Sequence, residues 1–159
     1  MANENKQYMI AAIKQVKDRV ADNVGGPFGA CIVLKDQVIS LGHNTVLEDV
    51  DPTCHAEINA IRTAAEKLGR YDLKGCVIYS TTEPCPMCFS AIHWANIDKI
   101  VYGTEIDDVK KLGFRELNID NHTLKKLGNS NIEIVSGFER EACKEMLEYW
   151  QEHSKLKTY

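Results

Sequence analysis

CHAEINAI (residues 54–61) and PCPMC (residues 84–88) place four chemically reactive side chains at the expected starts of two helices. His55 and Glu57 are two positions apart, and Cys85 and Cys88 are three positions apart. Cysteines with the latter spacing lie on one face of a helix. One imidazole and two thiolates are a common set of zinc ligands. The two stretches therefore predict two helices whose amino ends meet at one metal ion.

Helix geometry separates these four side chains into two roles. Residues two apart on a helix point about 200° away from each other, because one turn takes 3.6 residues. His55 and Glu57 can therefore serve one site only where the end of the helix faces that site. We expect His55, Cys85 and Cys88 to bind zinc, and Glu57 to stay off the metal and move protons. Three protein ligands leave the fourth position for water, as in catalytic rather than structural zinc sites.

Simpler interpretations of the same residues exist. His55 could cap a helix, Glu57 could be a solvated acid, and the cysteines could serve only for packing. The Cys-x-x-Cys pair could also be a thioredoxin-like redox motif, but that motif does not call for a His-x-Glu pair. Four further residues could complete the coordination of the metal, although we interpret them as packing or surface residues: His43, Cys54, Cys76 and His93.

Hydrophobic periodicity predicts that helices and strands alternate along the chain. Helices are expected at residues 6–22, 54–68, 86–95, 107–112, 121–127 and 138–152. Strands are expected at residues 76–82, 99–103 and 131–137, and a hairpin at residues 30–44. This order indicates an α/β fold, a three-layer α-β-α sandwich with a mixed five-stranded sheet. We expect residues 1–159 to form a single domain. The buried stripe of the second helix is predicted to be Ile58, Ile61, Ala65 and Leu68.

The composition limits the possible partners and compartments. The 159 residues carry a net charge of −4, which does not favour a nucleic-acid partner bound mainly through its phosphates. No apolar run is long enough to cross a bilayer, and the first residues lack the pattern of a secretory signal. We therefore expect a cytoplasmic protein with free thiols and no membrane partner. Three cysteines lie inside apolar patterns and are predicted to be core residues: Cys31, Cys76 and Cys143.

The stretches HAEINAI (55–61) and TEPCPMCFSAIHWA (82–95) resemble the cytidine-deaminase-like superfamily of zinc hydrolases. Within it, GGPFGACIV (25–33), DPTCHAE (51–57) and EPCPMC (83–88) are most similar to the bacterial guanine deaminases. The resemblance implies one zinc ion per subunit. It further implies the hydrolytic deamination of a small purine base, in which guanine is converted to xanthine and ammonia. It also implies a homodimer, with a C-terminal tail that covers the active site or is swapped between subunits.

The resemblance also assigns roles to residues outside the metal motif. Asn44 matches an asparagine that hydrogen-bonds the base, and Phe28 and Trp94 match aromatic residues that pack against the purine. Glu116 matches an acidic residue that acts as a second proton shuttle beside Glu57. Tyr159 matches a C-terminal aromatic residue that covers the pocket. An aspartate is more usual at the position of Glu116, so a related aminated ring, guanosine or an aminotriazine, stays open as the substrate.

Two other functions compete with deamination of a small purine. The tRNA adenosine deaminases share the HAE and PCxMC elements. They usually have a smaller or aliphatic residue at the position of Phe28, and TEIDDVKKLGFRELN (104–118) lacks their Lys-x-Gly-Ala stretch. The other alternative is a non-catalytic, zinc-stabilised binding module, in which a fourth protein ligand would replace the water. Glu57 argues against that alternative, because a structural zinc site has no use for a proton shuttle.

Overall fold

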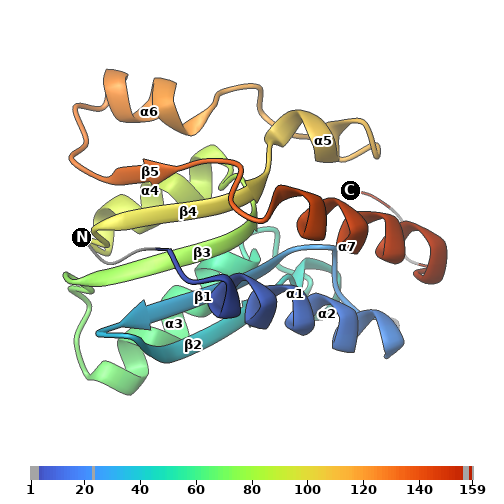
Figure 1. Cartoon of the computed structure of the whole chain (residues 1–159), viewed down its shortest axis with the longest axis horizontal. Coiled ribbons are helices and arrows are strands. Elements are labelled where there is room, and N and C mark those ends of the chain that lie inside the picture. Colours follow the sequence, from blue (N-terminus) through green and yellow to red (C-terminus); the bar gives the residue numbers. More distant parts are fainter. Residues whose placement is uncertain (1–3, 23, 156–157, 159) are drawn as a thin grey trace.

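The computed structural model describes residues 4–22, 24–155 and 158 of this chain. The helices are α1 (Lys6–Ala21), α2 (Val46–Asp49), α3 (Ala56–Leu68), α4 (Pro86–Trp94), α5 (Ile106–Lys110), α6 (Asn121–Leu127) and α7 (Arg140–His153). The strands are β1 (Gly29–Leu34), β2 (Gln37–His43), β3 (Cys76–Thr82), β4 (Lys99–Thr104) and β5 (Glu133–Val135). Figure 1 shows the sheet with its helices. Each of these described helices is too short or too polar to traverse a bilayer.

The strands form one mixed, five-stranded sheet in the order β2-β1-β3-β4-β5. β1 runs antiparallel to both of its neighbours, whereas β3, β4 and β5 are parallel. Thr82 at the end of β3 lies beside Thr104 at the end of β4. The segments that follow these two strands therefore leave the sheet at the same edge. One of them leads into α4, and the other leads into α5.

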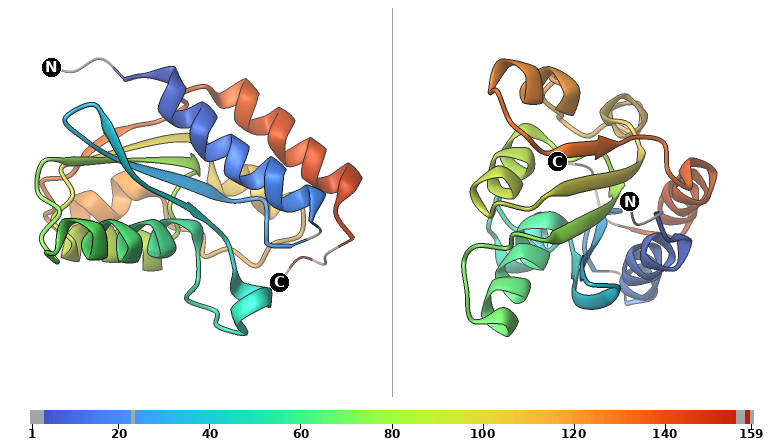
Figure 2. Two further views of the ribbon diagram at one scale, coloured as in Figure 1. Left: turned by 90° about the horizontal axis from the view of Figure 1, so that it is seen from below. Right: turned by 60° about the vertical axis from the view of Figure 1, so that its left-hand side comes forward.

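Helices cover both faces of the sheet. α1 and α7 lie side by side over one face, and α3 and α4 lie over the other (Figure 2). Side chains along the central strands alternate between the two layers, as expected for a strand buried on both faces. Tyr79 packs under α1 and α7, whereas its neighbour Ile78 packs under α3 and α4. The predicted three-layer α-β-α architecture is confirmed.

The predicted core cysteines are confirmed, since Cys31, Cys76 and Cys143 are fully buried. Burial raises the pKa of the Cys31 and Cys143 thiols to about 12, so both stay neutral in the core. The helix boundaries agree with the predicted ranges to within about two residues, the usual uncertainty of helix ends. The short helix α2 was not predicted, and β5 is shorter than the predicted strand at residues 131–137.

The predicted buried stripe of α3 is wrong. The buried side chains are Ala56, Glu57, Ala60 and Ala64. The predicted side chains are only half-buried: Ile58, Ile61, Ala65 and Leu68. A Cβ added at Gly42 of β2 would lie 2.2 Å from the carbonyl oxygen of Ala56, so the helix backbone rests directly on the strand. Small side chains therefore face the sheet, and the larger apolar residues flank the contact.

Candidate active site

The amino ends of α3 and α4 carry the predicted metal ligands. His55 is the N-cap of α3, and Cys85 is the N-cap of α4. Both residues have extended backbone conformations, and neither side chain makes a capping hydrogen bond to its own helix. Pro86 occupies the first turn of α4, where its missing N–H needs no partner. The two side chains are therefore free of helix capping and extend beyond the helix ends, as does Cys88 from the first turn of α4.

The three side chains converge on one point. The Nδ1 atom of His55 lies 3.6 Å from the Sγ atom of Cys85 and 3.6 Å from that of Cys88. Tetrahedral zinc with Zn–S of about 2.3 Å and Zn–N of about 2.05 Å separates its nitrogen and sulfur ligands by about 3.6 Å. The observed distances fit that geometry. Within the described part of the chain, this is the one His/Cys/Asp/Glu group with metal-ligand spacing.

The electrostatics of the three groups also suit a cation. The hydrogen bonds from Cys88 and His55 lower the pKa of Cys85 to about 4, against the opposing effect of burial. The same hydrogen bond to Cys85, together with burial, raises the pKa of Cys88 well above its ordinary value. Burial lowers the pKa of His55, but Cys85 and the nearby Glu57 outweigh burial and raise it. The thiolate is the form of cysteine that binds a metal, and the lowered pKa of Cys85 favours that form.

Glu57 lies beside this group and is held by a second contact. Its side chain is only 6% exposed. Its Oε1 atom accepts a hydrogen bond from Ser80 Oγ at 2.9 Å, and its Oε2 atom lies 3.5 Å from the Cys88 sulfur. Burial and the charge of Cys85 raise the pKa of Glu57. A raised pKa makes the carboxylate a better proton acceptor, as a group that accepts and returns a proton requires.

A pocket of about 210 Å³ opens next to the metal group. It contains two of the predicted metal ligands, His55 and Cys85, as well as Phe28 and Glu116. Burial and the charge of Cys85 raise the pKa of Glu116, in keeping with its place near the sulfurs. The other lining residues are Val46, Pro52, Pro86, Met87, Phe114, Arg115 and Leu117.

The other predicted substrate contacts lie elsewhere or outside the described residues. Asn44 is 1% exposed, and its Oδ1 atom accepts a hydrogen bond from the backbone N–H of Val46 at 3.2 Å. It does not line the pocket, although its backbone N–H donates to the carbonyl of Phe28 at 3.2 Å. Tyr159 is outside the described residues. Thr158 is described, and its Oγ1 atom would lie 3.3 Å from a Cβ added at Gly113, the residue before Phe114.

Trp94 is not brought to the pocket of its own chain. It is 80% exposed and ends α4, whereas the ligands begin that helix. Nine positions along a helix correspond to about 13.5 Å. Trp94 instead lies at a separate hollow between α4 and α6, together with Leu127.

The alternative metal ligands have other partners. His43 accepts a hydrogen bond from Nε of Arg19 at 2.9 Å, and His93 pairs with Ser130 at 3.2 Å. The Cys54 sulfur accepts a hydrogen bond from Arg62 at 3.4 Å. Cys76 is buried in the core between the sheet and α3. None of these four belongs to the metal group of the described residues, so that group supplies three ligands.

Sequence reasoning did not identify several residues of this site. Ser80 was missed, although it follows Cys76 and Ile78 at every second position and therefore faces α3. The aromatic wall residue Phe114 and its neighbour Arg115 were also missed, because residues 111–120 show neither a helical nor a strand period. The Phe114 ring packs edge-on against Phe28, with 5.1 Å between the ring centroids.

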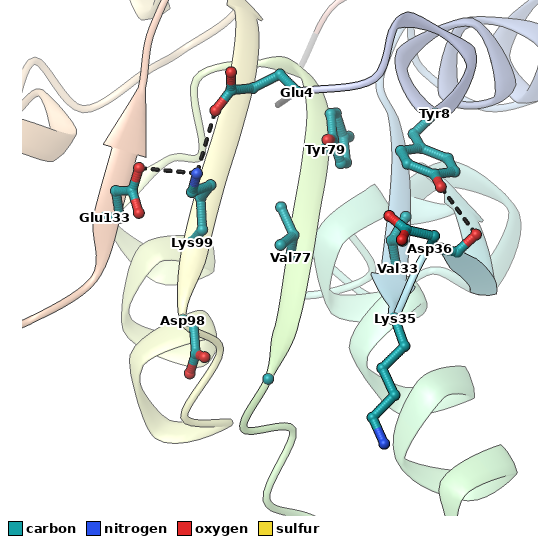
Figure 3. Close-up of a pocket in the computed structure, with 11 residues that line it drawn as sticks. Glu4, Tyr8, Val33, Lys35, Asp36, Val77, Tyr79, Asp98, Lys99 and Glu133 are labelled. Carbon is teal, nitrogen blue, oxygen red and sulfur yellow. Dashed lines mark hydrogen bonds and ion pairs between the residues drawn. The ribbon is translucent and has the colours of Figure 1, made fainter. Parts of the chain in front are cut away.

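A larger hollow of about 400 Å³ lies at the opposite edge of the sheet, where β3, β4 and β5 begin (Figure 3). Three of its charged groups are paired with one another. The Nζ atom of Lys99 lies 2.8 Å from Glu133 and 3.2 Å from Glu4. The Tyr8 hydroxyl donates to the backbone carbonyl of Asp36 at 2.9 Å. Because no metal-ligand group of the described residues faces this hollow, the pocket beside His55 is the candidate active site.

Two helix ends that bring one histidine and two cysteines together, with a glutamate off the metal, define the class of the zinc-dependent deaminases. The chain belongs to the cytidine and deoxycytidylate deaminase family, whose zinc-binding region matches residues 2–104. It is 41% identical to the guanine deaminase of Bacillus subtilis over 110 residues, which cover 69% of this chain and 70% of that protein. It is 33% identical to a tRNA-specific adenosine deaminase of Buchnera aphidicola over 144 residues, which cover 86% of this chain and 95% of that protein.

Solved structures agree with these sequence relationships. The fold matches the guanine deaminase from Nitrosomonas europaea with a TM-score of 0.84 and 27% identity, covering 96% of this chain and 87% of that one. The chain is therefore a hydrolytic deaminase of a zinc-binding family, as the sequence predicted.

Proposed function

We propose that the chain deaminates guanine to xanthine and ammonia. The observation that carries this proposal is the presence of two carboxyl groups, one beside the metal group and one in the wall of the adjoining pocket. Glu57 lies beside the metal group, and Glu116 lines the pocket that contains His55 and Cys85. Burial raises the pKa of both carboxyl groups, as expected for groups that hand protons to and from a substrate.

Each group has a distinct task in this proposal. His55, Cys85 and Cys88 would hold one zinc ion per subunit, and the bound ion would supply the Lewis acidity that makes water nucleophilic near neutral pH. Glu57 accepts the proton of the attacking water and passes it to the ring nitrogen next to the amino-bearing carbon. Glu116 delivers a proton to the amino group, which leaves as ammonia, and it regains a proton from the second O–H of the attacking water as the product carbonyl forms. Water supplies the oxygen of the product, so the reaction balances without a further co-reactant.

The pocket suits a free base. Its volume of about 210 Å³ is below the range of about 300–1,000 Å³ that is usual for small-molecule sites. Phe28 and Phe114 offer apolar ring surfaces to a flat heterocycle. We assign Asn44, which is hydrogen-bonded to the backbone of Phe28, to a contact with the base. A nucleotide within a folded RNA would have to enter the same small pocket with its ribose and phosphates outside.

Several wider properties belong to the same proposal. Residues 1–159 act as a single domain, in the cytoplasm, without a nucleic-acid or membrane partner. The active form is a homodimer, because Trp94 and Leu127 are 80% and 79% exposed and form an apolar patch on the surface. In that dimer Trp94 can contact only a substrate bound in the partner subunit, and Tyr159 covers the pocket of its own or of the other subunit.

Deamination of adenosine in tRNA is the second candidate, because a tRNA-specific enzyme is related over nearly its whole length. An ammonia-release assay separates the two candidates when guanine, guanosine, adenine, cytosine and a tRNA anticodon stem-loop are compared, with the zinc content measured in parallel. Turnover of guanine above all others supports the proposal. Preference for the stem-loop would instead show that the protein is a tRNA adenosine deaminase. Failure of the zinc-loaded protein to turn over any of these substrates would favour a non-catalytic binding module.

A further inference from the structure

Glu116 lies in a part of the pocket wall that has little regular secondary structure. It belongs to the segment between β4 and α6, in which α5 ends at Lys110 and no helix or strand follows until Asn121. Phe114 anchors the middle of this segment through ring contacts with Phe28 at 5.1 Å and with Trp150 at 5.6 Å. Those contacts hold the phenyl ring, but the direction in which Glu116 points also depends on how the two ends of the segment are held.

Glu83 holds both ends. Its Oε2 atom accepts a hydrogen bond from the backbone N–H of Ile106 at 3.3 Å, where the segment begins. Its Oε1 atom accepts one from the backbone N–H of Asn121 at 2.8 Å, where the segment ends. The Tyr102 hydroxyl donates a third, at 3.4 Å. One carboxylate therefore joins two points that are 15 residues apart in the sequence.

A reciprocal contact ties the same point to the metal group. The side chain of Asn121 is fully buried, and its Nδ2 atom donates to the backbone carbonyl of Pro84 at 2.6 Å. Glu83 and Pro84 are the two residues that directly precede the metal ligand Cys85. The segment with Glu116 and the loop with Cys85 therefore share one set of buried hydrogen bonds.

The chemistry of this contact calls for a carboxylate. Glu83 is 6% exposed, and no ion pair of the described residues includes it. The partners of its two carboxyl oxygens are hydrogen-bond donors: two backbone N–H groups and one hydroxyl group. An ionised carboxylate has about four lone-pair sites and can accept from several donors at once, whereas one of the two polar atoms of a glutamine amide is only a donor. A glutamine at this position would therefore turn an N–H group toward one of the two backbone N–H groups.

We propose that Glu83 is a positioning residue that sets the direction of Glu116 relative to the metal ligands. This inference rests on the proposed role of Glu116 as a proton shuttle. The proposal gives a function to Glu83, the acidic residue of the EPCPMC motif, which is not a metal ligand. Glu83 acts through the segment that it holds and does not touch the substrate.

A double-mutant cycle tests this inference with the zinc-loaded, full-length protein. The variants are Glu83→Gln, Glu116→Gln and the double variant, and the readouts are kcat and KM for guanine, zinc content and Tm. Misplacement of a catalytic group by about 1 Å can reduce a rate about 100-fold. We expect Glu83→Gln to lower kcat by about 10- to 100-fold with full zinc content. In the Glu116→Gln background the same substitution should change kcat less than about twofold, because little remains for Glu83 to position.

Two further variants make the result specific. Tyr102→Phe removes the third donor of Glu83 but leaves both ends of the segment attached, so kcat should change little. Asn121→Ala removes the contact with Pro84 and is to be taken through the same cycle if Glu83→Gln does not fold. Equal losses of kcat in both backgrounds would overturn the positioning role, since they would mean that Glu83 acts independently of Glu116. Wild-type turnover of Glu116→Gln alone would instead reject the shuttle role of Glu116 in the proposed function.

Discussion

Glu57 of α3 and Ser80 of β3 form a buried hydrogen bond of 2.9 Å between the first turn of a helix and the central part of the sheet. The bond uses one carboxylate oxygen and leaves the other directed at the metal group, 3.5 Å from the Cys88 sulfur. The bond therefore fixes the orientation of the glutamate without the involvement of the metal. A rigid strand sets the position of the proposed proton carrier, which is the kind of support that precise catalytic sites need.

Replacement of Glu57 by glutamine should leave the zinc content unchanged and lower kcat for guanine by about 10²- to 10⁴-fold. The amide keeps the size of the side chain and can still bond to Ser80, but it cannot carry a proton. Steady-state kinetics with zinc analysis measures both effects. Ser80→Ala is the matched control, because it frees the carboxylate without removing it and should reduce kcat less. A Glu57→Gln variant with near wild-type turnover would reject the shuttle assignment.

Replacement of Cys88 by serine should abolish stoichiometric zinc binding together with activity. Cys88 is fully buried, and its sulfur and that of Cys85 both lie 3.6 Å from the His55 ring nitrogen, so no other described group can take its place. Elemental analysis of the purified variant gives the zinc content. Cys54→Ser is the control, because Cys54 adjoins His55 but its sulfur contacts Arg62. Loss of zinc from the Cys54 variant would show that the ligand set is incomplete.

A methyl group added at Gly42 should destabilise the fold and displace the first turn of α3. The new Cβ would lie 2.2 Å from the carbonyl oxygen of Ala56, between His55 and Glu57 in the sequence. Overpacking of a close contact typically costs about 1–3 kcal/mol. Denaturant unfolding gives the free energy of unfolding, and kcat reports the displacement of Glu57.

Gly69→Ala separates this clash from backbone strain. Gly69 ends α3 with a φ of +62°, and a Cβ there would meet no atom within 4 Å. Its replacement should cost about 1–2 kcal/mol through the left-handed conformation alone and leave kcat unchanged. If Gly42→Ala also left kcat unchanged, the contact between β2 and α3 would not control the position of Glu57.

The stability of the protein should contain a pH-dependent contribution from His43. Burial and the neighbouring Arg19 lower the pKa of His43 below its ordinary value of 6.5. The unfolded chain therefore takes up a proton below pH 6.5 that the folded protein does not bind. The stabilisation is complete above the unfolded pKa and is lost as the pH falls toward the folded pKa.

His43→Gln isolates this contribution, because glutamine can accept the hydrogen bond from Arg19 but does not titrate. Tm is measured for the zinc-loaded wild type and the variant from pH 8 to pH 5. As the pH falls, the Tm of the wild type should decrease relative to that of the variant. All other titrating groups are common to both proteins and cancel in the difference. A constant difference across this range would mean that the pKa of His43 is not lowered in the folded state.

Local patterns in the sequence were sufficient for the types of the described elements other than α2 and for the grouping of the metal ligands. The periods of helices and strands depend on the nearest few residues, so the helices and strands could be assigned without knowledge of their neighbours. His55, Cys85 and Cys88 could be grouped because helix geometry restricts where first-turn side chains can point. Their convergence also requires that both helices begin at one edge of the sheet, and β2 and β3, the strands that precede them, both end at that edge.

Tertiary packing determined the features that local patterns do not encode. Which face of α3 is buried depends on the contact with Gly42, whose partner lies 14 positions away in the sequence at Ala56. The resemblance predicted a substrate contact for Trp94, yet the length of α4 keeps it from the pocket of its own chain. Glu116 reaches that pocket from a segment without periodicity. Glu83, which follows β3, holds this segment by accepting hydrogen bonds from the first residues of α5 and α6. Contacts between residues distant in sequence depend on the relative placement of whole elements, and that placement follows from the packing of the complete core.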